Sequence, residues 1–123
     1  MRKYVAAACA ISALMLSGSV LAQQAGATAP NKEVTGKDIA FDRKKGNCLA
    51  CHAMPTVPDA QSAGLYGPPL IAMSARYPSK AAMRAKIWDP TVSNPTTSML
   101  PYGKHQILTE AEIDKVTDFV YGL

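Results

Sequence analysis

The five residues from Cys48 to His52 constrain this chain more than any other part of its sequence. They read Cys48-Leu49-Ala50-Cys51-His52, so two thiols lie three positions apart and an imidazole follows the second thiol directly. This spacing is the attachment signature of a c-type haem. Two thiols on one turn can each form a thioether bond to a vinyl group of haem, and the adjacent imidazole then faces the iron. The motif predicts a domain built around one covalent haem, with Cys48 and Cys51 as anchors and His52 as an iron ligand.

Three other chemistries use the same residue types. A thioredoxin-like redox pair belongs in a βαβ context, and no segment of this chain alternates like a strand for long. A structural zinc site needs four protein ligands, and His105 is the one further residue that fits. A plain disulfide followed by a chance histidine is the last alternative. Haem attachment is the favoured interpretation, because it uses all three residues of the motif.

Residues 1–22 have the features of a secretory signal peptide. Arg2 and Lys3 precede an apolar stretch of about a dozen residues, and a small-residue cleavage site ends at Ala22. The apolar stretch is too short for a hydrocarbon core of roughly 30 Å, so a retained membrane anchor is the less favoured alternative. Cys9 leaves with this segment. We therefore expect export to the periplasm and no membrane span after processing.

Charge and length limit the partners and the core. The chain has 13 Lys and Arg against 9 Asp and Glu, a net charge of +4. Loss of Arg2 and Lys3 leaves 11 against 9 on a mature chain of 101 residues that begins near Gln23. No basic block or aromatic platform indicates a nucleic-acid partner. The core of so short a chain is thin, and a bulky prosthetic group is expected to fill part of it.

The expected fold class is all-α, with three to four short helices and long loops around the haem. Residues 37–45 are expected to form a short helix that stops at Gly46. A second helix is expected from an N-cap at Ser79 to Trp88, where an Asp-Pro pair ends it. No periodicity suggests regular structure in the proline-rich segments between these helices. Long loops of this kind make sense if they wrap a prosthetic group.

The last helix has the clearest signal. Thr109 and Glu112 form a capping box, and an apolar stripe follows it, made of Ile113, Val116 and Val120. The domain organisation predicted from these features is a signal peptide at 1–22, a flexible arm at 23–35 and a cytochrome domain at 36–123.

A haem iron with six ligands needs a second axial ligand, usually Met or His. The candidates outside the signal peptide are Met54, Met73, Met83, Met99 and His105. Met54 lies two residues after His52 and cannot reach the opposite face of the ring. Met83 shares a helical stripe with Ile87, which favours core packing. Met99 lies in an irregular loop shortly before the last helix, and we predict it as the ligand. Met73, His105 and an open sixth position remain as alternatives.

Gly67-Pro68-Pro69-Leu70 follows the haem motif in the next loop. A histidine ligand needs an acceptor at its other ring nitrogen, which fixes the orientation of the ring. We predict that the carbonyl of Pro68 provides that acceptor, which makes Pro68 part of the cofactor site.

Together these residues resemble the class I cytochromes c over most of residues 36–123. The features that carry the resemblance are Cys48-x-x-Cys51-His52, Gly67-Pro68-x-Leu70, a distal methionine loop and a terminal helix. The resemblance implies that the first and last helices cross and that the haem lies in a cleft lined by loops.

A closer resemblance is to the SoxX family, the monohaem subunits of the SoxAX thiosulfate-oxidising cytochromes. It rests on Gly46-Asn47 before the motif, Ala75-Arg76-Tyr77-Pro78, Ile87-Trp88-Asp89, Asn94-Pro95, and Gly103-x-His105-x-Ile107-Leu108-Thr109. One departure is Leu100, which separates Met99 from Pro101, whereas the family often has proline directly after the methionine.

This resemblance implies a place in periplasmic sulfur oxidation. SoxAX complexes join thiosulfate to a cysteine of the SoxYZ carrier and release two electrons, an L-cysteine S-thiosulfotransferase activity. With both remaining cysteines bound to haem, the thiol chemistry is expected on a SoxA-like partner, and this chain relays electrons to a soluble acceptor. The alternatives are a free-standing periplasmic monohaem carrier and a haem sensor or peroxidase with an open distal site.

Overall fold

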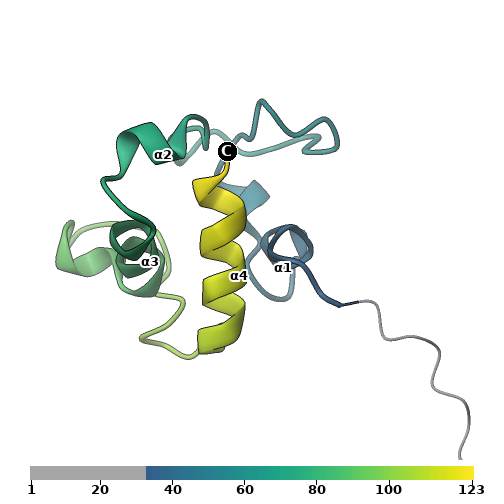
Figure 1. The fold of residues 1–123 in the computed structure, drawn as a ribbon. Helices are drawn as coiled ribbons and strands as arrows, with labels where there is room; N and C mark the ends of the chain where they lie inside the picture. The colour runs from purple at the N-terminus through teal and green to yellow at the C-terminus, as the bar shows by residue number, and fades with distance from the viewer. Residues whose placement is uncertain (1–32) are drawn as a thin grey trace, which may run out of the picture. The chain divides into compact units, whose positions relative to one another are not determined.

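The computed structural model describes residues 33–123, and these form an all-α arrangement with no strand among them (Figure 1). The expected signal peptide and residues 23–32 of the expected arm lie outside the described residues. None of the described helices is both long enough and apolar enough to cross a membrane. In chain order, the elements are α1 (Gly36–Phe41), the 3-10 turn η1 (Cys48–Ala50), α2 (Met73–Arg76), α3 (Lys80–Trp88), η2 (Pro90–Val92) and α4 (Glu110–Tyr121).

The capping box predicted for the last helix is confirmed. The Thr109 side chain accepts a hydrogen bond from the Glu112 amide, and the Glu112 carboxylate accepts one from the Thr109 amide at 2.9 Å. These two bonds satisfy amide groups that the first turn of a helix leaves without partners. The predicted stripe is buried, with Ile113, Val116 and Val120 each no more than 4 % exposed.

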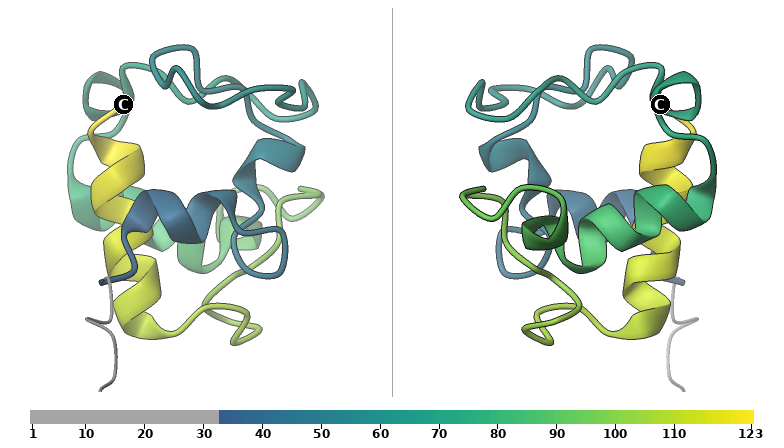
Figure 2. Two further views of the ribbon diagram at one scale, coloured as in Figure 1. Left: turned by 90° about the vertical axis from the view of Figure 1, so that its right-hand side faces the viewer. Right: turned by 90° about the vertical axis from the view of Figure 1, so that its left-hand side faces the viewer.

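Helix α1 crosses α4 at a point of close backbone contact (Figure 2). A Cβ atom built on Gly36 would lie 1.9 Å from the backbone oxygen of Lys115 in α4, so no side chain fits there. Ile39 and Ala40 follow on the same side and are completely buried. The crossing of the first and last helices expected from the resemblance is therefore present, and glycine at position 36 permits it.

The bounds of α1 differ from the expected helix at 37–45. Thr35 and Asp38 form a second capping box, which starts the helix one residue earlier. The helix ends at Phe41, and residues 43–46 form turns, in which the Gly46 amide donates to the Ile39 carbonyl at 3.1 Å. Glu33 and Val34, within the expected arm, both accept hydrogen bonds from Lys115 at 3.0 Å. The chain before α1 is thus attached to α4 from residue 33 onward.

Helix α3 packs on α4 on the side away from α1, so α4 lies between the two (Figure 1). Its Ser79 N-cap and its end at Trp88 are as predicted. Met83 and Ile87 are buried, which confirms their core role. Arg84 pairs with Glu110 and with Asp114, the latter at 2.6 Å. Apolar burial and a rim of ion pairs therefore hold this second helix contact.

Helix α2 was not expected from the sequence. It has four residues, and it follows Ala72, whose φ of 50° is left-handed. One distant and one nearby contact hold it: the Ala72 amide donates to the Leu123 carbonyl at 2.7 Å, and Arg76 donates to the Pro69 carbonyl, seven positions before it, at 2.8 Å. The helix buries Met73 against the core.

Candidate functional site

The predicted haem motif folds into one tight turn. The Cys51 amide donates to the Cys48 carbonyl at 3.2 Å, and the His52 amide donates to the same carbonyl at 2.9 Å. The turn starts after Asn47, whose left-handed φ of 47° suits an asparagine. Cys48 and Cys51 therefore lie on one turn, and neither is in a disulfide. The arrangement leaves both sulfur atoms available to a covalently attached group.

The Cys48 thiol is neutral at physiological pH. Burial, and to a smaller extent the neighbouring Cys51, raises its pKa to about 11. Redox-active cysteine pairs depend instead on a lowered thiol pKa. Among residues 33–123, no three His, Cys, Asp or Glu side chains gather as a metal-binding group, and His105 is exposed. The geometry therefore supports neither the redox-pair alternative nor the zinc alternative.

The His52 ring is fixed by the loop that contains Gly67 and Pro68. Its Nδ1 atom lies 2.7 Å from the Pro68 carbonyl oxygen and donates to it. This is the contact that the Gly67-Pro68 motif was expected to make. With Nδ1 used in this way, Nε2 is the ring nitrogen left for a metal.

The structure explains why position 67 of the site is a glycine. A Cβ atom at this position would lie 2.4 Å from Cε1 and 2.6 Å from Nδ1 of His52, so the loop backbone packs directly on the imidazole. The Gly67 amide also donates to the Cys51 carbonyl at 2.8 Å. Glycine here lets the loop approach the ring closely enough for Pro68 to reach it.

Met99 lies in the loop between η2 and α4, half-buried against the core. Hydroxyl groups tie its neighbours to the other side of the site. Ser98 hydrogen-bonds Tyr66 at 2.9 Å, and the Tyr102 hydroxyl donates to the Gly46 carbonyl at 2.6 Å. The structure thus links the Met99 segment to the His52-holding loop and to the turn before Cys48.

Tyr102 also lies close enough to the motif for its two cysteines to affect the phenol. Burial raises its pKa to about 12, and Cys48 and Cys51 add to the shift in the same direction. The phenol is therefore un-ionised at neutral pH and acts as a hydrogen-bond donor. No sequence signal marked this residue, because its role depends on a contact with Gly46, 56 positions away.

The other ligand candidates are three core methionines and one exposed histidine. Met54, Met73 and Met83 are buried in the hydrophobic core at 2 to 3 % exposure. His105 is exposed, as the surface interpretation of that residue expected. Of these four methionines, Met99 alone is not fully buried.

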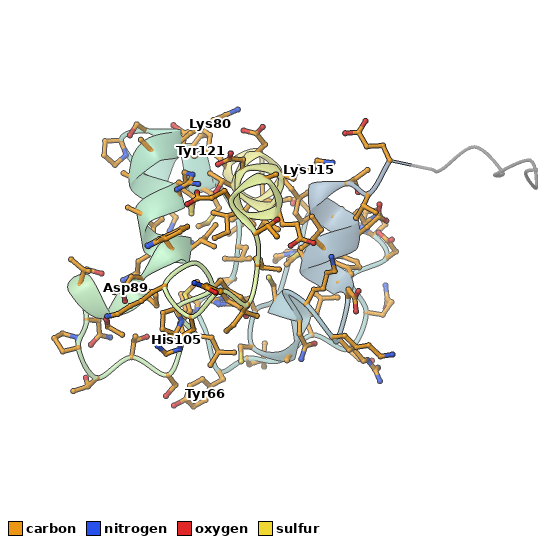
Figure 3. The ribbon with its side chains drawn as sticks, turned by 90° about the horizontal axis from the view of Figure 1, so that it is seen from below. Tyr66, Lys80, Asp89, His105, Lys115 and Tyr121 are labelled. Atoms are coloured by element: carbon orange, nitrogen blue, oxygen red, sulfur yellow. The ribbon has the colours of Figure 1, made fainter. Side chains whose placement is uncertain are left out.

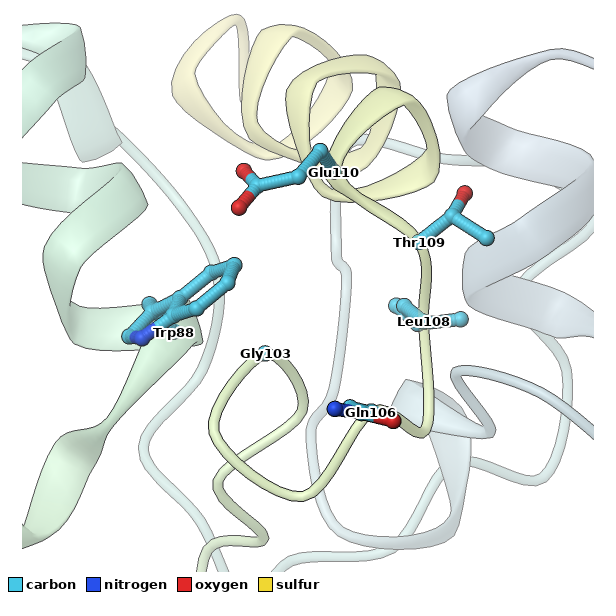
Figure 4. A pocket seen from close by; sticks show the side chains of 6 residues that line it. All are labelled: Trp88, Gly103, Gln106, Leu108, Thr109 and Glu110. Carbon is cyan, nitrogen blue, oxygen red and sulfur yellow. The ribbon is translucent and has the colours of Figure 1, made fainter.

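A separate pocket of about 420 Å³ opens between the end of α3 and the start of α4 (Figure 4). Trp88 and Glu110 face each other across it, and Gly103 packs so closely on the indole that a Cβ atom would lie 2.0 Å from the ring. None of the predicted haem residues lines this pocket. At this pocket, the segment after Met99 contacts α3 through Gly103 and Trp88.

Crossed terminal helices, a Cys-x-x-Cys-His turn and a loop packed on the histidine define an all-α fold of the class I cytochrome c type. The chain is similar to a chain in the crystal structure of SoxXA from P. pantotrophus. The TM-score is 0.63 and the sequence identity 24%, over 70% of this chain and 77% of that chain. No protein-family model matches the sequence, and neither does any curated protein. The structural similarity establishes the fold.

Proposed function

We propose that this chain is a periplasmic monohaem c-type cytochrome that transfers electrons as the SoxX-like subunit of a thiosulfate-oxidising complex. The observation that carries the proposal is the His52 imidazole, held at Nδ1 by Pro68 beside two unbonded thiols on one turn. A structural zinc site needs four protein ligands, and residues 33–123 bring together no group of three or more His, Cys, Asp or Glu side chains that could hold a metal ion. A covalent haem uses both thiols and the imidazole.

Each residue has one task in this proposal. Haem supplies a one-electron iron couple when it is bound. Cys48 and Cys51 would anchor it, and His52 would bind the iron through Nε2. The Pro68 carbonyl orients the imidazole and makes it a stronger donor ligand. Met99 would be the second iron ligand, and its thioether would raise the reduction potential relative to a second histidine.

The partner assignments follow from the thiols. Cys48 and Cys51 are the only cysteines outside the proposed signal peptide, so haem attachment leaves the mature chain without a free thiol. Bond formation between thiosulfate and a SoxYZ cysteine is therefore assigned to a SoxA-like partner. The similarity to a chain in the SoxXA structure supports the choice of partner. A single haem passes one electron at a time, so each two-electron turnover needs two transfers to the acceptor.

The first test is whether mature protein contains covalent haem. Protein from a host that matures c-type cytochromes is expected to be red and to weigh one haem more than residues 23–123. Cys48→Ser and Cys51→Ser are expected to impair attachment, whereas Ser74→Ala, an exposed residue of α2, leaves it unchanged. Colourless mature protein with the mass of the polypeptide alone would refute the proposal.

The second test concerns Met99. Met99→Ala is expected to keep the haem attached but to open the sixth position, with a change to a high-spin spectrum and a lower reduction potential. Met83→Ala is the control, because Met83 is buried between α3 and α4. A low-spin spectrum and an unchanged potential in Met99→Ala would exclude this residue as a ligand.

The third test separates a complex subunit from a free-standing carrier. Isolated from its native periplasm, the protein is expected to co-purify with a second c-type cytochrome. Migration alone at every salt concentration would favour the free-standing carrier.

A further inference from the structure

We propose that Tyr66 is a positioning residue that fastens the Met99 segment to the loop that orients His52. The inference rests on the proposed function, with Met99 as an iron ligand. It concerns the bond between Tyr66 and Ser98, which joins two loops that are 32 positions apart in sequence.

The bond joins one residue next to the loop that holds His52 and one residue next to Met99. Tyr66 directly precedes Gly67, which packs on the His52 ring, and Ser98 directly precedes Met99. The two hydroxyl oxygens are 2.9 Å apart. Figure 3 shows Tyr66 beside the segment that leads from α3 to α4. A single hydrogen bond therefore joins the loop on the histidine side to the loop on the methionine side.

The position of Tyr66 is not explained by core packing. Its side chain is 78 % exposed, and the preceding Leu65 is 85 % exposed. An exposed phenol gains little from burial, so the hydrogen bond to Ser98 is its main described contact in the fold. Its removal is therefore expected to cost the fold no more than this one hydrogen bond.

The Met99 segment has a second attachment that differs in strength. Tyr102 is partly buried and donates to the Gly46 carbonyl at 2.6 Å, so water competes less for this bond. Between the two attachments, the Met99 amide donates to Thr97 at 3.2 Å. The Tyr102 end is thus the fixed end of the segment, and the exposed Tyr66 end is the one that opens first.

The consequence concerns how often the methionine leaves the iron. An external ligand such as imidazole binds only after Met99 has moved away, so its limiting binding rate measures opening of the segment. A hydrogen bond of this kind contributes ~1 kcal/mol net, which corresponds to about a five-fold change in an equilibrium. Loss of the Tyr66–Ser98 bond is therefore expected to raise the limiting rate about five-fold.

The experiment measures imidazole binding to oxidised holoprotein at saturating imidazole. Tyr66→Phe and Ser98→Ala are each expected to bind about five-fold faster, and the double variant no faster than either single one. Ser98→Thr keeps a hydroxyl and is expected to behave as the unmodified protein does. Tyr121→Phe, which removes a phenol hydroxyl at the end of α4, is the matched control and is expected to leave the rate unchanged.

Thermal unfolding of the same variants distinguishes positioning from general stabilisation. The Tm of Tyr66→Phe is expected to fall by no more than the few degrees that one hydrogen bond accounts for, and by as much as that of Ser98→Ala, while its imidazole rate and reduction potential change. Equal rates in Tyr66→Phe and the unmodified protein would overturn the inference, and so would independent, multiplying effects of the two single substitutions.

Met99→Ala provides the upper limit for the rate of imidazole binding. It also distinguishes failure of the Tyr66 positioning role from failure of the Met99 ligand assignment. If Met99→Ala binds imidazole much faster but Tyr66→Phe does not, the positioning role fails and the ligand assignment stands. If Met99→Ala is no faster than the unmodified protein, the ligand assignment fails and the inference fails with it.

Discussion

The crossing of α1 and α4 and the loops that hold the proposed haem residues are stabilised in opposite ways. At the crossing, Ile39 and Ile113 are completely buried, and capping boxes begin both helices. In the loops, Cys51 is exposed, and His52 and Met99 are only half-buried. The loops depend on isolated hydrogen bonds such as that between His52 and Pro68. The contacts within and between the helices therefore bury far more apolar surface than those of the loops, where the haem is proposed to bind.

The largest expected effect is that of haem on the loops. Isolated helices below about 12 to 15 residues are marginal in water, and α4 has 12 residues. Without haem, ordering the long loops is not offset by burial, so we expect the apoprotein to be largely unfolded. Circular dichroism of protein made without haem attachment checks this. A cooperative thermal transition in that material would show that the crossing folds independently.

The second prediction is a glycine-to-alanine substitution where α1 crosses α4. Gly36→Ala puts a methyl group against the Lys115 backbone oxygen, which cannot turn away as a side chain would. We expect a loss of about 2–3 kcal/mol in the free energy of unfolding of the holoprotein, measured with denaturant. In Gly122→Ala the nearest atoms lie at 3.5 Å, an ordinary contact, so this variant is the matched control. Equal losses in both variants would contradict the close crossing.

The third prediction is a glycine-to-alanine substitution in the loop that packs on His52. Gly67→Ala places a methyl group 2.4 Å from His52 Cε1 and separates the imidazole from the Pro68 carbonyl. Because the loop is at the surface, we expect about 1 kcal/mol or less of lost stability but a clear change in the haem absorption spectrum and reduction potential. Gly36→Ala should show the reverse pattern. A spectrum unchanged by Gly67→Ala would argue against the orientation of His52 by this loop.

The smallest effect concerns acid stability. The Lys45 ammonium, together with the Thr109 amide, holds the pKa of Glu112 below its ordinary value of 4.5. A lowered folded-state pKa stabilises the fold above the ordinary value, and this stabilisation is lost as the pH falls through the lowered one. Glu112→Gln is therefore expected to cost about 0.5 kcal/mol near neutral pH, a difference that shrinks below pH 4.5. Tm measured against pH checks this, and a constant difference down to pH 3 would contradict it.

The parts of the fold that the sequence predicted correctly have local causes. Thr109 and Glu112 are three residues apart, and Ser79 directly precedes its helix, so short-range rules identify both starts. The start of α1 has the same kind of signal in Thr35 and Asp38, and the prediction missed it. Its end at Phe41 depends on a turn in which the Gly46 amide bonds to the Ile39 carbonyl. The prediction took Gly46 as the stop signal and so ended the helix too late.

The parts that were not predicted have distant causes. Helix α2 is held by a bond from Ala72 to Leu123 at the other end of the chain. The contacts of Tyr66 with Ser98 and of Tyr102 with Gly46 span 32 and 56 positions. The Cys-x-x-Cys-His motif and the Gly67-Pro68 turn were recognisable because each is continuous in sequence. Residues that hold one loop to another leave no such pattern.

The packing of Trp88 on Gly103 has a practical consequence. Trp88 is the only tryptophan in the chain, and the glycine beneath its ring is four residues after Met99. If the backbone at Gly103 moves away, one face of the indole becomes exposed to solvent. The molecule therefore contains its own fluorophore at the fixed end of the Met99 segment, and a change in its emission would report release of that end without an attached dye.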